Sequence, residues 1–582
     1  MMQQGRFLKE IVVFIFIVMG FVLMARINAH AAEKNQLGVV RYNIEYNGKQ
    51  RGEGPVLILQ YFNNTATIQG LEENSDRKQI DGLAKETTYF DYNTQKILNK
   101  AVSEKIGTFY YETPFSKLDE LTYTDETTTI LGYKCKLAKM NLRSNRIDIW
   151  YTEEAGIQGT PYQATANTPG LVLKIERNGN FEIVARSIEF NKNTKIKSLI
   201  PDDLGELVPQ VEYQSRLRES LVHTVSVFDH VQLNYQSDYK SPQVLDSEKI
   251  MHFAKGTVAL RKIKLPDLPD HYSIFAEVVQ CSNGDAYDRT GSAFIIPTDS
   301  VHSFLDGMTK GVDSLPSFFD KNGQRYEGMV ATNQYLPPVE LVRFFTPFGV
   351  RHFNNDVQVK GQTWADSAYY KQDVSELRHY LKNEVWIGAY IANYDKGGHY
   401  LSLKLKYYPG RQVVNEKAEN SWQMPLFESL NLLEVAGQNY PAFFATDTLS
   451  VSFTVPEKVK NLQLRYITTG HGGWGGGDEF NQKTNEIFID GELVFSYIPW
   501  RTDCAVYRNL NPASGNFWNG LSSCDISRSG WCPGSLTNPV YVPLPDLKPG
   551  NHVIKIAIPQ GEKEGNSQSH WNVSGILLGE KE

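Results

Sequence analysis

An aspartate followed directly by an arginine stands at the start of an expected strand. Asp288 and Arg289 precede the apolar run Gly291–Ile296 and follow a stretch rich in turn-forming residues. A carboxylate at a sheet edge with a guanidinium beside it can move a proton and stabilise negative charge. Taken alone, a surface turn with an incidental ion pair is the simpler interpretation of this segment.

A glycine-rich loop is the second candidate. Gly470–Gly477 contains six glycines among eight residues, includes His471 and Trp474, and leads into Asp478 and Glu479. Glycines let the backbone approach a ligand closely and cannot fill a core, so a tryptophan in this loop needs another domain or a ligand to pack against. A flexible hairpin loop is the alternative, but the embedded acids and aromatic rings favour a functional loop.

The third candidate is the segment Ser527–Gly534, which places Arg528 and Trp531 beside Cys532. A tryptophan between an arginine and a half-cystine would be held rigidly. Such a pair suits stacking on the face of a sugar ring while the guanidinium binds its hydroxyls. A disulfide-stapled loop with a buried tryptophan explains the same residues equally well.

Together with the turn Phe345–Phe348, these three segments resemble the peptide-N-glycosidase F family. The resemblance spans Val225–Leu578 and rests on four separated motifs in one order: Asp-Arg before a strand, aromatic-Thr-Pro-aromatic, a Gly/Trp/His loop leading to an acid, and Arg-x-Gly-Trp-Cys-Pro-Gly. It implies two tandem eight-stranded antiparallel jelly rolls. It also implies hydrolysis of the amide that joins asparagine to the first N-acetylglucosamine of an N-linked glycan, without a metal or another cofactor.

The resemblance also implies roles for individual residues. Asp288 would activate water and transfer protons. Arg289 would provide orientation and support the oxyanion. Glu479 would bind the substrate near the scissile amide or polarise the water. The family's long-loop disulfide would join Cys504 to Cys532. The substrate-binding residues expected from the motifs are Arg528, Trp531, Trp474, His471 and Asp478.

Two features depart from the family pattern. Matching Lys396–Gly397 to the family's Lys-Gly places Ile391 where the family has a third acid, and it stays open whether Asp395 replaces that acid. The family's small disulfides are incomplete, because Cys281 lacks its near neighbour and Cys524 is extra. A Cys281–Cys524 bond that ties the two jelly rolls together therefore stays open as well.

Metal-binding patterns do not occur in the sequence. The twelve histidines form no HxH or HxxxH pair, and the five cysteines include no CxxC, so neither zinc nor copper is indicated. The lack of clustered His and Met ligands argues against a copper monooxygenase, a class that is also built from two jelly rolls. A non-catalytic glycan-binding protein is the other alternative, and the presence of both Asp288 and Glu479 argues against it.

The elements that must hold these residues are expected to be short strands. Alternating or aromatic-rich runs are separated by Gly, Asn, Asp and Pro, Asp490-Gly491 predicts a tight hairpin, and helical periodicity is limited to one or two turns in Thr290–Leu305 and Asp373–Asn383. This pattern predicts a mainly β protein built of sandwiches. The clearest expected strands are Val39–Tyr46, Arg146–Tyr151, Leu171–Glu176, Ser273–Val279, Tyr400–Tyr407, Leu462–Ile467 and Glu486–Ile489.

The predicted order of domains is a signal peptide (1–31), an N-terminal β-rich domain (34–195), a polar linker with helical potential (196–222), and two jelly rolls (223–409 and 410–582). Around Thr168–Leu173 the N-terminal block resembles, in degraded form, a small β-rich family named for a Gly-Leu-Pro-Gly-Leu-Ile signature. Its position and length also resemble the bowl-shaped domain of larger glycanases, and we expect no catalysis from it.

The first residues have the pattern of a secretory signal. Arg6 and Lys9 precede the apolar run Ile11–Ala25, and Ala29 and Ala31 are small residues placed as signal peptidase requires. An uncleaved anchor is the less favoured alternative. The net charge of −7 with scattered charges argues against nucleic acid as a partner. We expect an exported monomer, periplasmic or secreted and free of the membrane after cleavage, whose partners are N-glycosylated proteins or glycopeptides.

Overall fold

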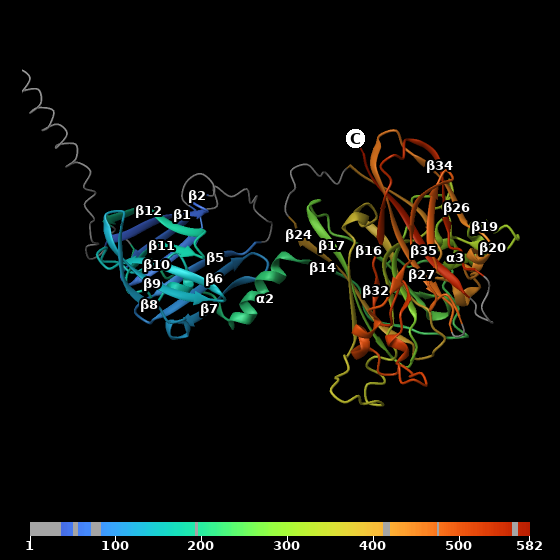
Figure 1. Ribbon diagram of the computed structural model, residues 1–582, viewed down its shortest axis with the longest axis horizontal. Coiled ribbons are helices and arrows are strands. Elements are labelled where there is room, and N and C mark those ends of the chain that lie inside the picture. The colour runs from blue at the N-terminus through green and yellow to red at the C-terminus, as the bar shows by residue number, and fades with distance from the viewer. Residues whose placement is uncertain are drawn as a thin grey trace, which may run out of the picture. The chain divides into compact units, whose positions relative to one another are not determined.

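The computed structural model describes residues 36–50, 56–70, 83–192, 196–410, 420–473, 476–561 and 569–581. The chain divides into two compact units, Met1–Leu221 and Val222–Glu582 (Figure 1). The predicted signal peptide lies outside the described residues. Among those that are described, no helix is both long enough and apolar enough to span a bilayer.

The described residues of the N-terminal unit form a thirteen-stranded sheet. Its strand order is β13-β7-β6-β5-β4-β3-β1-β12-β11-β10-β9-β8, with β2 paired to β1. Side chains along β9 alternate between buried and exposed, as in Tyr133, Lys134 and Cys135, so one face of the strand lines the core. The strands, blue to cyan-green in Figure 1, are β1 (Gln36–Tyr46), β2 (Lys49–Gln50), β3 (Leu57–Phe62), β4 (Thr65–Gly70), β5 (Lys85–Asp91), β6 (Lys96–Ser103), β7 (Gly107–Pro114), β8 (Thr122–Ile130), β9 (Tyr133–Leu142), β10 (Asn145–Thr152), β11 (Leu171–Arg177), β12 (Phe181–Lys192) and β13 (Glu206–Leu207).

The segment expected as a linker belongs to this unit. Strand β13 pairs parallel with β7, and helix α2 (Gln210–Leu221) follows it. The buried ring of Tyr213 packs against Phe109 at 5.2 Å and Tyr111 at 4.7 Å between centroids. Leu217 lies one helical turn further on and packs in the same cluster, which gives the helix an apolar stripe. That stripe attaches residues 206–221 to the sheet.

The first jelly roll encloses its core between two antiparallel sheets. Inward side chains such as Val278 and Leu403 of one sheet meet Leu341 and Ile387 of the other. The sheets are β14 (His223–Leu233), β24 (His399–Pro409), β17 (Tyr272–Ser282) and β22 (Ala368–Asp373), and β15 (Met251–Phe253), β16 (Val258–Lys264), β23 (Glu384–Ile391), β18 (Thr290–Ile296), β21 (Val339–Phe345) and β32 (Leu536–Thr537). Between β18 and β21 the chain forms α3 (Phe304–Lys310), β19 (Ser317–Phe319) and β20 (Arg325–Glu327).

The two sheets of the second jelly roll contain eight strands among the described residues, as expected, whereas those of the first contain ten, one of which is β32 from the second half of the chain. The Asp490-Gly491 pair forms the tight hairpin between β28 and β29, with φ of 51° and 90°. Its sheets are β25 (Ser421–Glu428), β35 (His570–Lys581), β27 (Val459–His471) and β33 (Val540–Pro543), and β26 (Leu449–Val455), β34 (Gly550–Ala557), β28 (Asn485–Ile489) and β29 (Glu492–Tyr497). All seven strands expected from the sequence lie inside observed strands, and the mainly β fold is confirmed.

The two jelly rolls share structure at their junction. Strand β32 comes from the second half of the chain and pairs with β21 of the first roll. Ile576 and Leu578 of β35 pack in the core of the first roll, whereas Leu577 between them packs in the core of the second. Strand β35 therefore contributes one face to each core, and the rolls form one body.

A buried ion pair of β21 lies at this junction and is hydrogen-bonded to β35. Arg343 donates to both carboxylate oxygens of Glu340, at 3.0 and 2.8 Å, and both side chains are fully buried. Arg343 also donates to the carbonyl oxygen of Asn572 at 2.6 Å, and the Ser574 hydroxyl donates to Glu340 at 2.8 Å. Because a buried ion pair is tolerated only when its hydrogen bonds are made, these contacts fix how β21 sits on β35.

Replacing Arg343 with Met should lower the free energy of unfolding by about 3 kcal/mol or more, because Glu340 is left as an unpaired buried acid. The measurement is the denaturant midpoint of the full chain. The exposed Lys249–Asp246 pair provides the control, since Lys249→Met should change the midpoint only slightly. Equal midpoints for the two variants would contradict the role given to Arg343.

Candidate active site

One guanidinium joins two acids from different jelly rolls. Arg528 begins the short strand β31 (Arg528–Ser529). Its Nε donates to Oε1 of Glu479 at 2.8 Å and its Nη2 to Oδ2 of Asp288 at 3.2 Å. Asp288 lies just before β18 of the first roll, and Glu479 follows β27 of the second. The two carboxylates are within about 9 Å of each other, because a guanidinium is small and planar.

Arg528 is itself buried, with a side chain that is 1% exposed. Its Nη1 donates to the carbonyl oxygens of Ser523 at 2.8 Å and Ile526 at 3.3 Å. Its Cζ atom lies 4.9 Å from the ring centroid of Trp531 and 5.1 Å from that of Phe480. The sequence motif suggested direct contact between this arginine and a sugar, but here its donors serve the two acids and the surrounding loop.

Both acids are largely removed from water, with side chains 16% and 15% exposed. Desolvation raises the pKa of Asp288 to about 7, against the positive charge of Arg528 and with help from the negative charge of Glu479. Desolvation also raises the pKa of Glu479, again opposed by Arg528. An acid with a pKa near neutrality can both accept and return a proton, which is the property required of a general acid–base.

Arg289 is held by an acid that the sequence patterns did not indicate. Its Nε donates to Asp285 at 2.8 Å, and its guanidinium lies 5.0 Å from the ring of Tyr287. Asp285 is 2% exposed. Burial raises the pKa of Asp285, but contacts with His399 and Arg289 outweigh it and lower the pKa to about 2. The signal in the sequence is the four-residue spacing of Asp285 and Arg289 within one turn-rich segment.

Trp531 lies in the interior instead of on a binding surface. It is 2% exposed, stacks on Phe345 with centroids 4.1 Å apart, and donates its indole N–H to the carbonyl oxygen of Gly470 at 3.0 Å. The buried ring packs against the guanidinium of Arg528 and helps to hold it in place. The expectation that Trp531 contacts the glycan is not met, because the alternative of a buried tryptophan in a stapled loop describes its surroundings.

The glycine-rich loop gives a similar outcome for His471 and Asp478. His471 is 8% exposed, and burial holds its pKa well below the usual range, so the ring is neutral at physiological pH. Asp478 is 3% exposed and accepts the indole N–H of Trp571 at 2.7 Å. Both side chains are buried at the base of the loop and do not form an exposed surface for a ligand. Trp474 lies outside the described residues.

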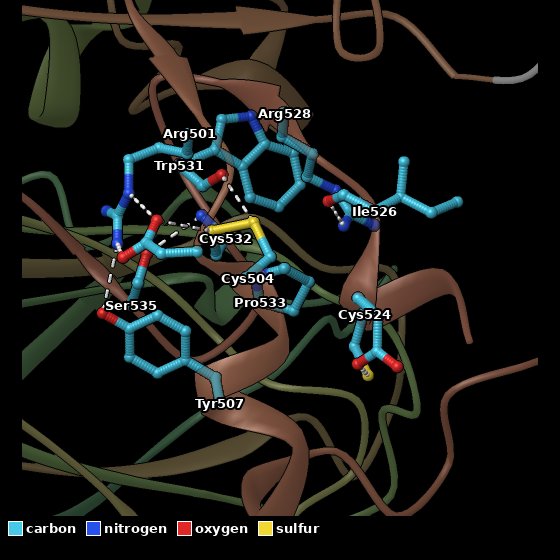
Figure 2. The surroundings of a disulfide bond; sticks show 12 residues. Arg501, Cys504, Tyr507, Cys524, Ile526, Arg528, Trp531, Cys532, Pro533 and Ser535 are labelled. Atoms are coloured by element: carbon cyan, nitrogen blue, oxygen red, sulfur yellow. Dashed lines mark hydrogen bonds and ion pairs between the residues drawn. A yellow bond between two sulfur atoms is a disulfide. The ribbon is translucent and has the colours of Figure 1, made fainter. Parts of the chain in front are cut away.

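The disulfide implied by the resemblance is present. Cys504 and Cys532 are bonded, with Cα atoms 5.1 Å apart, and close a loop that includes Arg528. Figure 2 shows the ring of Trp531 beside this bond and Cys524 apart from it. A cross-link of this kind stabilises a fold by about 3 kcal/mol through the unfolded state.

The Cys281–Cys524 bond left open by the sequence is absent. The described residues include all five cysteines, and Cys281 and Cys524 are buried free thiols. The sulfur of Cys281 lies 3.4 Å from Nη1 of Arg351, and that of Cys524 lies 3.2 Å from Nη1 of Arg508. Each thiol is thus held in a separate polar contact.

Asp395 has a structural role at the end of β23. Its Oδ1 accepts the backbone N–H groups of Gly397 at 2.7 Å and Gly398 at 2.8 Å, which forms the turn into β24. Ile391, at the position of the family's third acid, is fully buried. Neither residue adds a carboxylate to the pair on Arg528. Among the described residues, no group of three or more His, Cys, Asp or Glu side chains is placed to hold a metal ion.

Comparisons with known proteins agree with this architecture. Residues 224–407 match the family model for the N-terminal domain of peptide-N-glycosidase F, residues 439–578 match that for its C-terminal domain, and residues 40–215 match that for an N-glycanase N-terminal domain. No curated protein matches the chain.

Solved structures give the same result. The structure of PNGF-II in the P21 space group is 41% identical, with 94% of this chain and 100% of that chain covered and a TM-score of 0.85. The C2 form is also 41% identical, with 94% and 98% covered and a TM-score of 0.78. PNGase F, a glycosylasparaginase from Flavobacterium meningosepticum, is 14% identical over 62% of this chain and 96% of that chain, with a TM-score of 0.39.

Replacing Arg528 with Met should destabilise the protein by about 3 kcal/mol or more, because two buried acids lose their shared cation. The pKa values of both acids, already raised, should rise further. A raised pKa in the folded state means that stability is present at low pH and is lost as pH rises through that pKa. The denaturant midpoint of the variant should therefore fall more at pH 9 than at pH 6.

Arg501→Met is the matched control, because Arg501, on the neighbouring strand β30 (Trp500–Arg501), pairs with the half-exposed Asp503. Arg501 holds the pKa of Asp503 below its usual range, so Asp503 is ionised at both pH values and the loss should be small and equal. A pH-independent loss in Arg528→Met would contradict the electrostatic role of Arg528.

Proposed function

Because the chain belongs to the peptide-N-glycosidase F family, we propose that it hydrolyses the amide between an asparagine side chain and the first N-acetylglucosamine of an N-linked glycan. Asparagine becomes aspartate, and the glycan leaves as a glycosylamine. The observation that carries the proposal is the convergence of Asp288 and Glu479, from two jelly rolls, on the buried Arg528. The 41% identity with PNGF-II over the whole of that chain supports it.

Hydrolysis of an amide needs an activated water, a stabilised tetrahedral oxyanion and a proton for the leaving amine. We assign the first and last tasks to Asp288, whose pKa of about 7 lets it take a proton from water and return it to nitrogen. The anomeric bond is untouched, so the carboxylate distances that distinguish retaining from inverting glycosidases do not apply.

The other two charged residues support this chemistry. Arg289 is oriented by Asp285 and lies over Tyr287, so its positive charge is available to the oxyanion that forms beside Asp288. Glu479 binds the substrate near the scissile amide, and its negative charge raises the pKa of Asp288. Arg528 keeps the two acids at a fixed separation. Its role in catalysis is therefore to position them.

The biological setting follows from the same proposal. The substrates are N-glycosylated proteins or glycopeptides, and the predicted signal at residues 1–31 would export the enzyme. We propose that it acts as a monomer, because both acids and the arginine that joins them come from one chain.

Replacing Asp288 with Asn should lower the rate of deglycosylation by at least about a hundredfold, since a positioned acid–base group is lost. Conversion of asparagine to aspartate in a denatured N-glycoprotein, followed by mass spectrometry, measures that rate. Asp503→Asn, a half-exposed acid outside the pair, is the control and should retain nearly full activity. Near-normal turnover by Asp288→Asn would remove Asp288 from the mechanism.

The pH dependence should show the ionisation of Asp288. As the base, Asp288 must be deprotonated, so kcat/KM should increase as pH rises through about 7. Glu479→Gln removes a negative charge that raises the pKa of Asp288, so this increase should move to lower pH even though the maximal rate falls. Glu486→Gln, on β28 away from the acids, should leave the profile unchanged. A profile that does not move in Glu479→Gln would contradict the coupling.

A further inference from the structure

Three phenol groups converge on one carboxylate at the junction of the jelly rolls. Glu434, in the short helix η8 (Glu434–Ala436), accepts the hydroxyl of Tyr390 at 3.2 Å and also those of Tyr394 and Tyr440. Tyr390 is the penultimate residue of β23 in the first roll and Tyr394 follows that strand, whereas Glu434 and Tyr440 come after β25 of the second. These four residues are called the tyrosine cluster below.

Two of the three rings face solvent. Tyr390 is 2% exposed, whereas Tyr394 is 55% and Tyr440 is 42% exposed. Burial and the hydrogen bonds to Glu434 raise the pKa of both exposed tyrosines, so each phenol stays protonated and continues to donate to the carboxylate. The exposed rings are therefore fixed in place before any ligand arrives. Rigid, exposed aromatic rings with polar edges are suited to binding a partner that has both apolar and hydroxyl groups.

The cluster lies close to the catalytic arginine of the first roll. The backbone N–H of Ala392, two residues before Tyr394, donates to the carbonyl oxygen of Thr290 at 2.9 Å, next to Arg289 in the chain. The positive charge of Arg289 acts on the Tyr394 phenol and favours its ionised form. Tyr394 is therefore near the site of chemistry.

A row of rings connects the cluster to the acids of the second roll. The ring of Tyr440 lies 5.0 Å from that of His570, which lies 5.0 Å from that of His471. His471 lies 5.8 Å from Trp531, which supports Arg528. The exposed end of this row is Tyr440 and its buried end is at Arg528. Tyr394 is thus connected to the segment that carries Arg289, and Tyr440 is connected through stacked rings to Trp531 and Arg528.

We propose that Tyr394 and Tyr440, held by Glu434, form a subsite for a pyranose ring of the glycan, further from the protein substrate than the sugar whose amide is cut. The apolar C–H face of a pyranose would stack on a fixed ring, and its hydroxyls would donate to the phenol oxygens and the Glu434 carboxylate. The inference rests on the proposed function. It adds that the enzyme recognises the glycan beyond its innermost sugars.

The test uses the full chain and two glycopeptides with the same peptide, one with a complete neutral N-glycan and one trimmed to its two innermost sugars. In Tyr394→Ala and Tyr440→Ala, KM for the complete glycan should rise about tenfold while kcat stays within about twofold, because a stacked ring is lost. KM for the trimmed substrate should not change. Tyr394→Phe and Tyr440→Phe keep the rings and should keep most of the affinity.

A control variant and two contrary outcomes complete the test. Tyr369→Ala removes a ring that is 56% exposed on β22, outside the cluster, and should leave both KM values unchanged. Equal increases in KM for the two substrates would overturn the subsite. So would a lowered denaturant midpoint in the Ala variants with no change in KM for the complete glycan, since the cluster would then only stabilise the fold.

Failure of the proposed function gives a different result. If the wild-type chain cleaves neither glycopeptide, calorimetric titration with the free neutral glycan still tests the subsite. Binding by the wild type that is lost in the double variant Tyr394→Ala/Tyr440→Ala supports it without any catalysis. Equal binding by both proteins, or binding by neither, overturns it.

Discussion

The contact on which the active site depends is the buried guanidinium of Arg528 between two carboxylates. Asp288 and Glu479 belong to different jelly rolls, and at close range without a cation they would repel each other. Three features described above keep Arg528 in place: the ring of Trp531 behind it, the carbonyl oxygens of its own loop, and the disulfide that closes that loop. Burial of the Asp288 carboxylate in this arrangement raises its pKa to about 7.

The same constraint explains why the jelly rolls form one body. A shared guanidinium can hold two acids only if their parent sheets do not slide, and the Arg343–Glu340 pair and the two faces of β35 prevent sliding. A buried ion pair contributes little net stability compared with apolar residues of the same size, but it has strict geometric requirements. Here those requirements act at the junction where the two acids must converge.

The sequence predicted what depends on local pattern or ordered motifs. Strands such as β10 follow from their alternation, and the resemblance implied the Cys504–Cys532 bond and singled out Asp288 and Glu479, which the structure brings to one guanidinium. Burial, in contrast, depends on packing between distant segments, so Trp531 could not be distinguished from a surface ring. The orientation of Arg289 by Asp285, and the thiol state of Cys281, depend on contacts in the folded chain, which spacing alone does not determine.

The exchange of strands between the rolls determines when the enzyme can become active during its synthesis. The first roll, made earlier, lacks its edge strand β32 and the side chains Ile576 and Leu578 until the second roll has been made. A nascent chain that already contains Asp288 and Arg289 therefore has neither a closed core nor Arg528. The first roll and the site at Arg528 therefore assemble only after the second roll has been synthesised through β35.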